Sequence, residues 1–384
     1  MNEELHSLIL WENSRKDSEK VIESIKEKFE ICQIFEIEWP KQKFVSNLKR
    51  FYGITLADPQ NKKSKCGDGP FLLIIIRDQN PIDGKRKTSL GSQIVNTNIY
   101  DFKMKTRKTL GSGYSIHSSI HQKEANHDFM LLLGKSLEEI SADYKNPWNG
   151  EIKELKKDLF GNYWKNPEEI FKLLNSTVNY VILRNFENFP DELISSKHAD
   201  VDILTNEKFQ IPFLLNMKKI NSKNVGYSPL IDINGKKVKF DVRYVEDGYY
   251  DQFWAKNILK NKIKTDEGFF VPSNEDYFYS LLYHMLIHKS RIQKDYSDRL
   301  FEIIPDSIKE KYDRQDFDNL EKLMQILKNF MQKNGYKKTN SIAYSIKHNE
   351  ILRLINVGIY TIKHEGWNFL FRAIRFKISK TISK

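Results

Sequence analysis

Short apolar stretches alternate with amphipathic stretches along the first 78 residues of the chain. Apolar runs at residues 7–11, 32–39 and 71–76 predict β-strands, and residues 18–29 and 44–51 have the spacing of helices. Strands separated by helices are typical of a layered α+β fold. We therefore expect a compact sheet domain at the amino-terminal end of the chain.

Two polar, glycine-containing segments, residues 61–69 and 80–92, are expected to be loops. Beyond them, apolar residues at helical spacing lead to Gly134, a residue type that commonly ends helices. A polar linker follows around residue 150. The first domain should therefore cover residues 1–140.

A second sheet is predicted in the middle of the chain, after a helix at residues 167–174. The dipeptide Asn234-Gly235 is typical of a tight hairpin turn and precedes the last strand. The strands are expected at residues 180–183, 201–204 and 238–245. These elements predict a domain over residues 150–270.

From residue 274 onward the pattern is nearly all helical, which predicts a third domain over residues 271–384. Its helices are expected at residues 277–288, 317–332 and 339–360. Residues 367–384 mix aromatic and aliphatic side chains with lysine and arginine. This pattern indicates either an interfacial helix on an anionic membrane surface or a solvated helix packed on the domain.

Composition limits the class of protein. An apolar fraction of 40% and an aromatic fraction of 12% are those of a folded chain. Cys32 and Cys66 are the only cysteines, which excludes a disulfide framework and a cysteine-rich zinc module and favours a reducing compartment. No secretory signal or apolar run of about 18 residues is visible. We expect a cytoplasmic protein, with the tail as a potential peripheral contact to the inner membrane face.

A formal net charge of +11 indicates an anionic partner, whether nucleotide, nucleic acid, acidic polymer or membrane surface. The charge does not choose among them.

Three aspartates carry the strongest chemistry. Asp200 and Asp202 lie two apart on a predicted strand and so share one face, and Asp241 lies on a later strand with apolar neighbours. Adjacent carboxylates favour a hard divalent cation, Mg²⁺ or Mn²⁺. Such a centre can neutralise charge on a transferred phosphoryl group and orient an attacking hydroxyl. The alternative is a solvated acidic strand face, because Asp-x-Asp often occurs by chance.

This arrangement resembles the nucleotidyltransferase superfamily over roughly residues 160–270. The resemblance implies that Asp200 and Asp202 are the metal-binding pair and that Asp241 is the third acid, which helps to activate the attacking hydroxyl. Where that family has glycine-serine, this chain has Arg184-Asn185. Arg184 and Asn185, together with Arg243, are therefore expected to bind substrate phosphate.

A histidine segment in the first domain provides a second candidate centre. His117 precedes a predicted helix, and a carboxylate further along could orient it for attack on phosphorus. The segment looks partly like the nucleoside diphosphate kinase signature: His117 matches the phosphorylated histidine, Ser119 the serine and Asp128 the orienting acid. This resemblance implies a ferredoxin-like first domain, with Arg107 as part of a phosphate clamp.

The match to those kinases is partial. Residues 11–13 are Trp-Glu-Asn where the kinases have lysine-proline-aspartate, so a binding domain without kinase activity is also open. A further alternative is that His117, His121 and His127 are polar residues around a helix start. Zinc binding is disfavoured because positions 121 and 127 do not share a helical face.

In the helical part, His284 and His288 lie four apart, a spacing able to bind metal, although a structural role is favoured. Lys289 and Arg291 are expected to contact substrate phosphate.

Together these patterns predict a Mg²⁺-dependent nucleotidyl- or phospho-alditol/sugar-phosphate transferase of cell-surface polysaccharide synthesis (capsule, lipopolysaccharide or teichoic-type). Its partners would be a nucleotide-activated donor and a phosphorylated or glycan acceptor. Choline-phosphate and fukutin-type transferases offer a fold-level analogy. The alternatives are a toxin-like nucleotidyltransferase that modifies tRNA or protein, and a non-catalytic nucleotide-binding scaffold.

Overall fold

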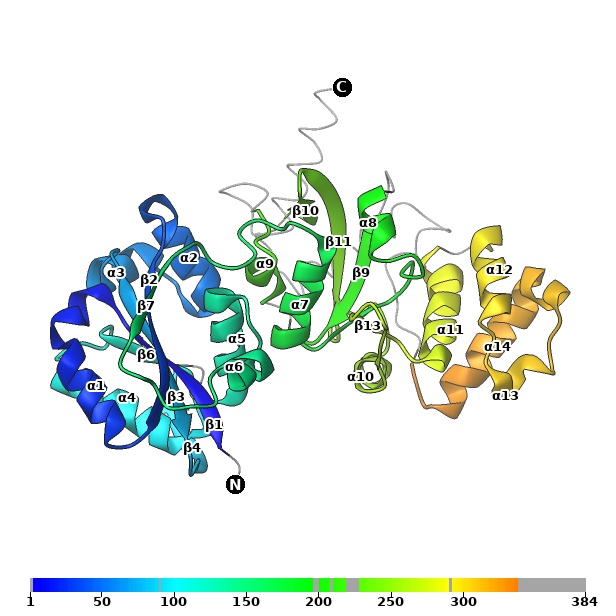
Figure 1. The fold of residues 1–384 in the computed structure, drawn as a ribbon. Helices are drawn as coiled ribbons and strands as arrows, with labels where there is room; N and C mark the ends of the chain where they lie inside the picture. Colours follow the sequence, from blue (N-terminus) through cyan, green and yellow to red (C-terminus); the bar gives the residue numbers. More distant parts are fainter. Residues whose placement is uncertain are drawn as a thin grey trace. The chain divides into compact units, whose positions relative to one another are not determined.

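The computed structural model describes residues 3–89, 91–195, 200–207, 210–218, 228–289 and 292–337. The chain is an α+β protein with mixed sheets and helices and a helical carboxy-terminal region (Figure 1). Contacts divide it into two compact units. One contains Met1–Thr177 and Phe209–Asn216, and the other contains Val178–Lys208 and Met217–Lys384. The domain boundaries 1–140, 150–270 and 271–384 stay a prediction, because contact grouping does not test independent folding.

The first unit is built on a five-stranded sheet in the order β6-β1-β3-β2-β7. The strands are β1 (Glu4–Leu10), β2 (Glu30–Glu38), β3 (Phe71–Asp78), β6 (Ile116–Ser118) and β7 (Ile152–Lys156). All pairs are antiparallel except β2 with β7. Every residue of the central strand β3 is buried, as its continuous apolar sequence requires. The three strands expected in this region are thus confirmed, with somewhat longer ends.

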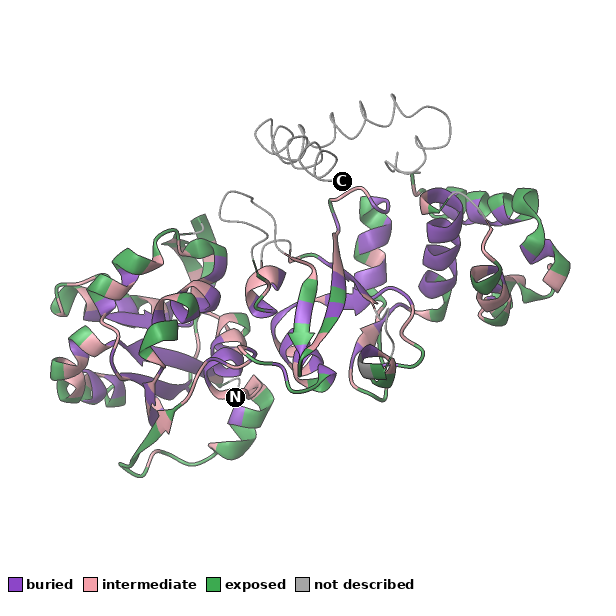
Figure 2. Cartoon of the chain, turned by 90° about the horizontal axis from the view of Figure 1, so that it is seen from above, coloured by how far each residue is buried: buried purple, intermediate pink, exposed green. Residues whose placement is uncertain are grey.

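Helices cover both faces of this sheet. On one face, α1 (Ser18–Lys26) and α4 (Thr97–Thr109) pack against strand residues that include Leu8, Leu10 and Ile116. On the other, α2 (Phe44–Tyr52) and α5 (Gln122–Leu133) lie over the alternate residues. The inner strands of the sheet are buried, with the exposed faces of the helices outside (Figure 2), whereas the edge strand β7 is largely exposed. Gly134, in the left-handed conformation with φ 72°, ends α5 as predicted.

The remaining elements of this unit are short. They are the 3-10 turns η1 (Glu12–Asp17), η2 (Lys41–Lys43) and η3 (Gly53–Thr55), and the helices α3 (Pro59–Cys66), α6 (Leu137–Asp143), α7 (Pro167–Thr177) and α9 (Ile211–Leu214).

Two segments expected to be loops are ordered elements instead. Residues 61–69 overlap helix α3, which begins with Pro59 and is capped by the Asp58 side chain accepting from Asn61 N–H. Residues 80–92 overlap the hairpin of β4 (Asp83–Thr88) and β5 (Gly91–Asn96). Both predictions were wrong for one reason: these elements are so polar that they lack the apolar period by which helices and strands are found.

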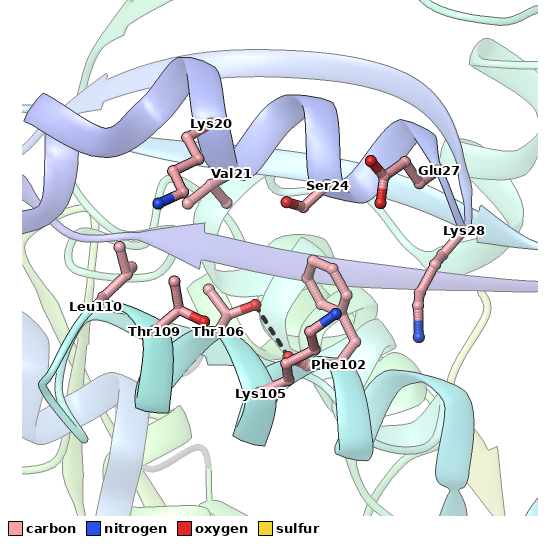
Figure 3. Close-up of a pocket in the computed structure, with 10 residues that line it drawn as sticks. All are labelled: Lys20, Val21, Ser24, Glu27, Lys28, Phe102, Lys105, Thr106, Thr109 and Leu110. Atoms are coloured by element: carbon pink, nitrogen blue, oxygen red, sulfur yellow. Dashed lines mark hydrogen bonds between the residues drawn. The ribbon is translucent and has the colours of Figure 1, made fainter.

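A cavity of about 50 Å³ lies between α1 and α4 (Figure 3). Val21, Phe102 and Leu110 line it, with Lys20 and Lys105 nearby. The usual ligand site measures about 300–1,000 Å³, so this cavity is too small to be one.

The second unit contains a four-stranded sheet in the order β10-β11-β9-β8. The strands are β8 (Tyr180–Ile182), β9 (Asp200–Thr205), β10 (Leu230–Ile233) and β11 (Lys236–Tyr244). Strands β9 and β11 are parallel, and the other pairs are antiparallel. Asn234 and Gly235 have φ of 50° and 85°, which confirms the hairpin turn between β10 and β11. A small ribbon of β12 (Ile263–Lys264) and β13 (Phe270–Val271) completes the strands in the described part of this unit.

Helices follow the sheet and share its core. Leu183 and Leu204 belong to the same buried cluster as Trp254, Tyr283 and Phe330. Helix α11 is buried from Asp276 to its end (Figure 2) and continues into a π-helical turn. The elements are α8 (Asp191–Ser195), α10 (Gln252–Lys260), α11 (Asn274–Tyr283), the π-turn η4 (His284–His288), α12 (Lys294–Glu302), α13 (Asp306–Lys309), the 3-10 turn η5 (Arg314–Asp318) and α14 (Leu320–Lys333).

The helices expected at 277–288 and 317–332 are confirmed with shifted ends. The helix expected at 339–360 and the basic tail at 367–384 lie outside the described residues. Within the described part of the chain, no helix combines the length and the apolar character needed to cross a bilayer.

Arg50 of α2 anchors α9 in the first unit. Its Nε donates to the carbonyl of Phe213 at 2.9 Å, and Nη2 donates to that of Leu214 at 2.7 Å. Its Nη1 donates to Oδ1 of Asn162 at 3.0 Å. The side chain is only 4% exposed, so these acceptors have little access to water if Arg50 is lost.

We expect Arg50→Lys to lower the free energy of unfolding by about 2 kcal/mol or more, because an ammonium cannot satisfy the same fork of acceptors. Urea unfolding followed by circular dichroism measures the change. The control Lys26→Met removes an exposed ion pair with Glu23 in helix α1, and it should lower the free energy of unfolding by less than about 0.5 kcal/mol. Equal effects of the two variants would contradict an anchoring role.

Candidate metal centre and buried histidine pair

The predicted aspartate triad is assembled by the parallel pairing of β9 and β11. Asp202 lies directly opposite Asp241, and Asp200 lies on the same side of β9 as Asp202. One carboxylate oxygen from each residue can be chosen so that all lie within 4.8 Å of one another. Among the described residues, this is the one group of three or more histidine, cysteine or acidic side chains that could hold a metal ion. Three oxygen ligands suit Mg²⁺ or Mn²⁺.

Asp202 is the most buried member of the triad. It is 4% exposed, and its Oδ1 lies 2.8 Å from Nη2 of Arg184. Burial raises the pKa of Asp202; the Arg184 charge opposes this rise, and the charges of Asp200 and Asp241 add to it. A bound cation would lower that pKa again, so metal binding should strengthen as the pH rises.

Lys239 already places one positive charge at the triad. Its Nζ forms an ion pair with Oδ2 of Asp241, and its position on β11 lies opposite Asp200. The hydrogen bond to Asp241 and the nearby carboxylates raise the pKa of Lys239. No sequence pattern indicates this pair, because Lys239 is one of several lysines on the strand.

Arg184 and Asn185 follow β8 after one intervening residue, Leu183. Arg184 is 6% exposed and pairs with Asp202, so its cation neutralises a member of the triad. Asn185 has φ 59°, and its Oδ1 accepts from Nη1 of Arg299 at 2.9 Å. Arg299 was not predicted, because it comes from a helix more than a hundred residues away.

An aromatic cluster around Tyr249 lies in the same unit. The guanidinium of Arg243 lies 4.4 Å from the centre of the Tyr249 ring, and the His288 ring stacks on that ring at 3.7 Å. The Tyr249 hydroxyl is 2.6 Å from Nδ1 of His284. Nε2 of His288 lies 3.1 Å from the Tyr249 carbonyl oxygen.

Burial lowers the pKa of His284 to about 2 and that of His288 to about 3, so both rings are neutral near pH 7. Each histidine uses one ring nitrogen in its contact with Tyr249, which is a structural role. Lys289 is exposed just beyond the π-turn, and Arg291 lies outside the described residues. A π-turn in a helix frequently marks a functional position.

The second candidate centre brings His117 and Asp128 together as predicted. Nε2 of His117 lies 2.9 Å from Oδ2 of Asp128, whose side chain is 1% exposed. Asp128 also accepts from the Ser7 hydroxyl at 2.5 Å. Burial alone would raise the pKa of Asp128, but His117 and His127 hold it well below its ordinary value. A carboxylate bonded to Nε2 orients the ring and leaves Nδ1 as the nitrogen that can react.

Two other residues predicted for this centre, Ser119 and Arg107, form their hydrogen bonds with other groups than the His117 ring. The Ser119 hydroxyl lies 3.1 Å from Nδ1 of His6 and accepts from Ser7 N–H at 3.0 Å. Arg107 donates from Nε and Nη2 to the carbonyl of Ile116 at 3.1 and 3.0 Å. The His117 ring meets the edges of Phe51 and Tyr52 at 5.5 and 5.4 Å between ring centres.

Lys239→Met should tighten Mn²⁺ binding up to about fivefold, because it removes an ammonium that competes for Asp241 at a partly exposed pair. Asp241→Asn should weaken binding. Titration of free Mn²⁺ by electron paramagnetic resonance measures both. Lys237→Met, on the same strand but paired with Asp232 of β10, is the matched control and should leave affinity unchanged. Weaker binding in Lys239→Met than in the parent protein would contradict the competition.

Comparison of the chain with protein-family models, curated proteins and solved structures found no match. The function therefore has to be inferred from the chemistry of these two centres.

Proposed function

We propose that Asp200, Asp202 and Asp241 form the active site of a Mg²⁺- or Mn²⁺-dependent phosphorus-transferring enzyme, a nucleotidyl- or phospho-alditol/sugar-phosphate transferase. One observation carries the proposal: parallel pairing of two strands gathers three carboxylates closely enough to share one ion. A divalent ion held there would neutralise charge on a transferred phosphoryl group.

The neighbouring cations have separate roles in this proposal. Arg184 is held against Asp202, and its charge favours the ionised form of that buried carboxylate. Lys239 and Arg243 lie two residues before and after Asp241 on β11, so all three side chains share one side of the strand. There the two cations are suited to bind donor phosphates. Asp241, the more exposed acid of the facing pair, is suited to accept a proton from the attacking hydroxyl. Asn185 and Lys289 remain candidates for further substrate contacts.

The proposal extends to the folds of the two units. A βαβ-type order with the spatial order β6-β1-β3-β2 supports a ferredoxin-like, nucleoside diphosphate kinase-like first domain. A mixed sheet with the acid pair on one strand and the third acid on its neighbour supports a nucleotidyltransferase-like second domain. In the latter, Arg184-Asn185 occupies the place of the glycine-serine turn.

For the biological setting we propose synthesis of a cell-surface polysaccharide at the cytoplasmic face of the membrane. A nucleotide-activated donor and a phosphorylated or glycan acceptor fit a cation-rich site in a chain of net charge +11. The alternative is an enzyme that modifies tRNA or protein. A nucleic-acid partner is less favoured than a glycan or phosphorylated acceptor. A non-catalytic scaffold is the remaining alternative.

We expect the protein to transfer label from at least one nucleoside triphosphate, or from a nucleotide-activated alditol or sugar phosphate, in the presence of Mg²⁺ and a glycan or phosphorylated acceptor. Asp200→Asn and Asp202→Asn should lower turnover by about a hundredfold or more, since each removes a charged ligand of the ion. Chromatography of the labelled products measures this.

The variant Asp232→Asn, at an exposed carboxylate of β10, is the control and should keep full turnover. Equal turnover in Asp202→Asn and the parent protein would contradict the proposal. Activity with tRNA alone would favour the toxin-like alternative.

A second candidate activity is supported by the His117 and Asp128 pair: transfer of a phosphoryl group through a phosphohistidine. A carboxylate on Nε2 favours attack by the opposite ring nitrogen, Nδ1. In that step the Nδ1–P bond forms as the bond between phosphorus and its leaving oxygen breaks.

Incubation with γ-labelled ATP should therefore give an acid-labile, base-stable phosphoprotein. The label should be lost in His117→Gln and strongly reduced in Asp128→Asn, while His121→Gln keeps it. Equal labelling of the His117→Gln variant would exclude this activity at His117.

A further inference from the structure

Lys62 is a buried lysine that lies among aromatic rings. It comes from helix α3, it is 7% exposed, and no described residue forms an ion pair with it. Its Nζ lies 4.8 Å from the ring centre of Tyr52, 5.3 Å from that of Tyr114 and 5.4 Å from that of Trp11. Lysines are rarely buried without a partner, because the charge loses its hydration.

Two aromatic neighbours of Lys62 carry polar atoms that have no partner. The Tyr52 hydroxyl and Nε1 of Trp11 are both buried, and neither has a hydrogen-bond partner among the described residues. Trp11 is fully buried and packs against Trp39, Phe44 and Phe71, so its ring cannot turn toward water. Native proteins rarely leave such donors unsatisfied, and an unbound ligand is one common explanation.

Arg107 contributes a second positive charge near Lys62. Burial lowers the pKa of Lys62 to about 8, and the charge of Arg107 adds to that effect. The thiol of Cys66 nearby stays protonated, since burial raises its pKa to about 11. The oxygens of the Asp128 carboxylate are already bonded to His117, Ser7 and His127.

We propose that Lys62, Tyr52 and Trp11 form a binding site for the phosphate group of a small phosphorylated molecule. Each of the three would donate one hydrogen bond, and a dianion would compensate the charges of Lys62 and Arg107. A phosphate can accept from three donors that approach from different elements, and its two negative charges match two nearby cations, whereas a carboxylate carries one. Tyr114, which is 36% exposed, forms the outer edge of the cluster.

This site goes beyond the proposed function, because it needs neither the aspartate triad nor a covalent step at His117. It also assigns a role to α3, which packs against η1 and supplies a lysine beside the end of β1, where residues 11–13 include none.

The test is equilibrium dialysis of the full chain with ³²P-orthophosphate and, in a second arm, with labelled glycerol phosphate. We expect the parent protein to bind both probes. Lys62→Met should weaken that binding by about tenfold or more, the effect of losing a hydrogen bond to a charged group. Tyr52→Phe should weaken it about three- to tenfold.

Tyr52→Phe is the sharper variant, because the hydroxyl it removes has no partner in the fold. Its melting temperature should therefore equal or exceed that of the parent protein. Lys103→Met is the matched control: Lys103 is 9% exposed and burial lowers its pKa to about 8, but its Nζ donates to the Ser118 carbonyl at 3.4 Å. This control should bind phosphate normally.

Failure of this site is distinguishable from failure of the proposed transferase, since Asp202→Asn should bind both probes as the parent protein does. Parent-like binding in Tyr52→Phe and Lys62→Met would overturn the site, and so would an absence of binding by the parent protein at millimolar probe. An equal loss in Lys103→Met would also overturn it, because the effect would then follow from any buried charge. If Lys62→Met fails to fold, Tyr52→Phe decides alone.

Discussion

The register between β9 and β11 is the constraint on which the candidate metal centre depends. Because side chains alternate along a strand, a slip of one residue would turn Asp241 to the opposite face, beside Val201 and Ile203. Burying an unpaired carboxylate among these apolar residues would be strongly unfavourable. The apolar residues Val238 and Phe240 of β11 fix the same register from their own face. Ordinary core packing therefore positions the carboxylates, and the ion need not do so.

The triad could be predicted because its geometry follows from local rules. Spacing of two on a strand places Asp200 and Asp202 together, and one assumption of strand pairing adds Asp241. The partners of these acids could not be predicted, because Arg184 and Lys239 reach them only once the sheet register is known. The same limit hid Arg299, which meets Asn185 across a separation of 114 residues.

Polarity misled the prediction in the first unit. Helix α3 has almost no apolar face, so its sequence resembled a loop, and Lys62 and Lys65 looked like exposed charges. Asp58 and Pro59 were the available signal, since they form a helix start, but without an apolar period they were not decisive. Lys62 was consequently missed, although His117 and Asp128 in the same unit were predicted from the resemblance of their segment to a kinase signature. The spacing of His284 and His288 correctly indicated a shared face, which is used to hold Tyr249.

The anchoring of α9 by Arg50 has a consequence for dissecting the protein. The chain leaves the second unit after β9, contributes Phe209–Asn216 to the first, and then returns. No single cut can thus release either unit whole. A fragment beginning at residue 178 would carry α9 without its arginine and would expose Ile211 and Leu214, which are buried in the full chain. Separation by gene truncation would need a short artificial bridge between β9 and β10, with α9 supplied to the first unit as a graft.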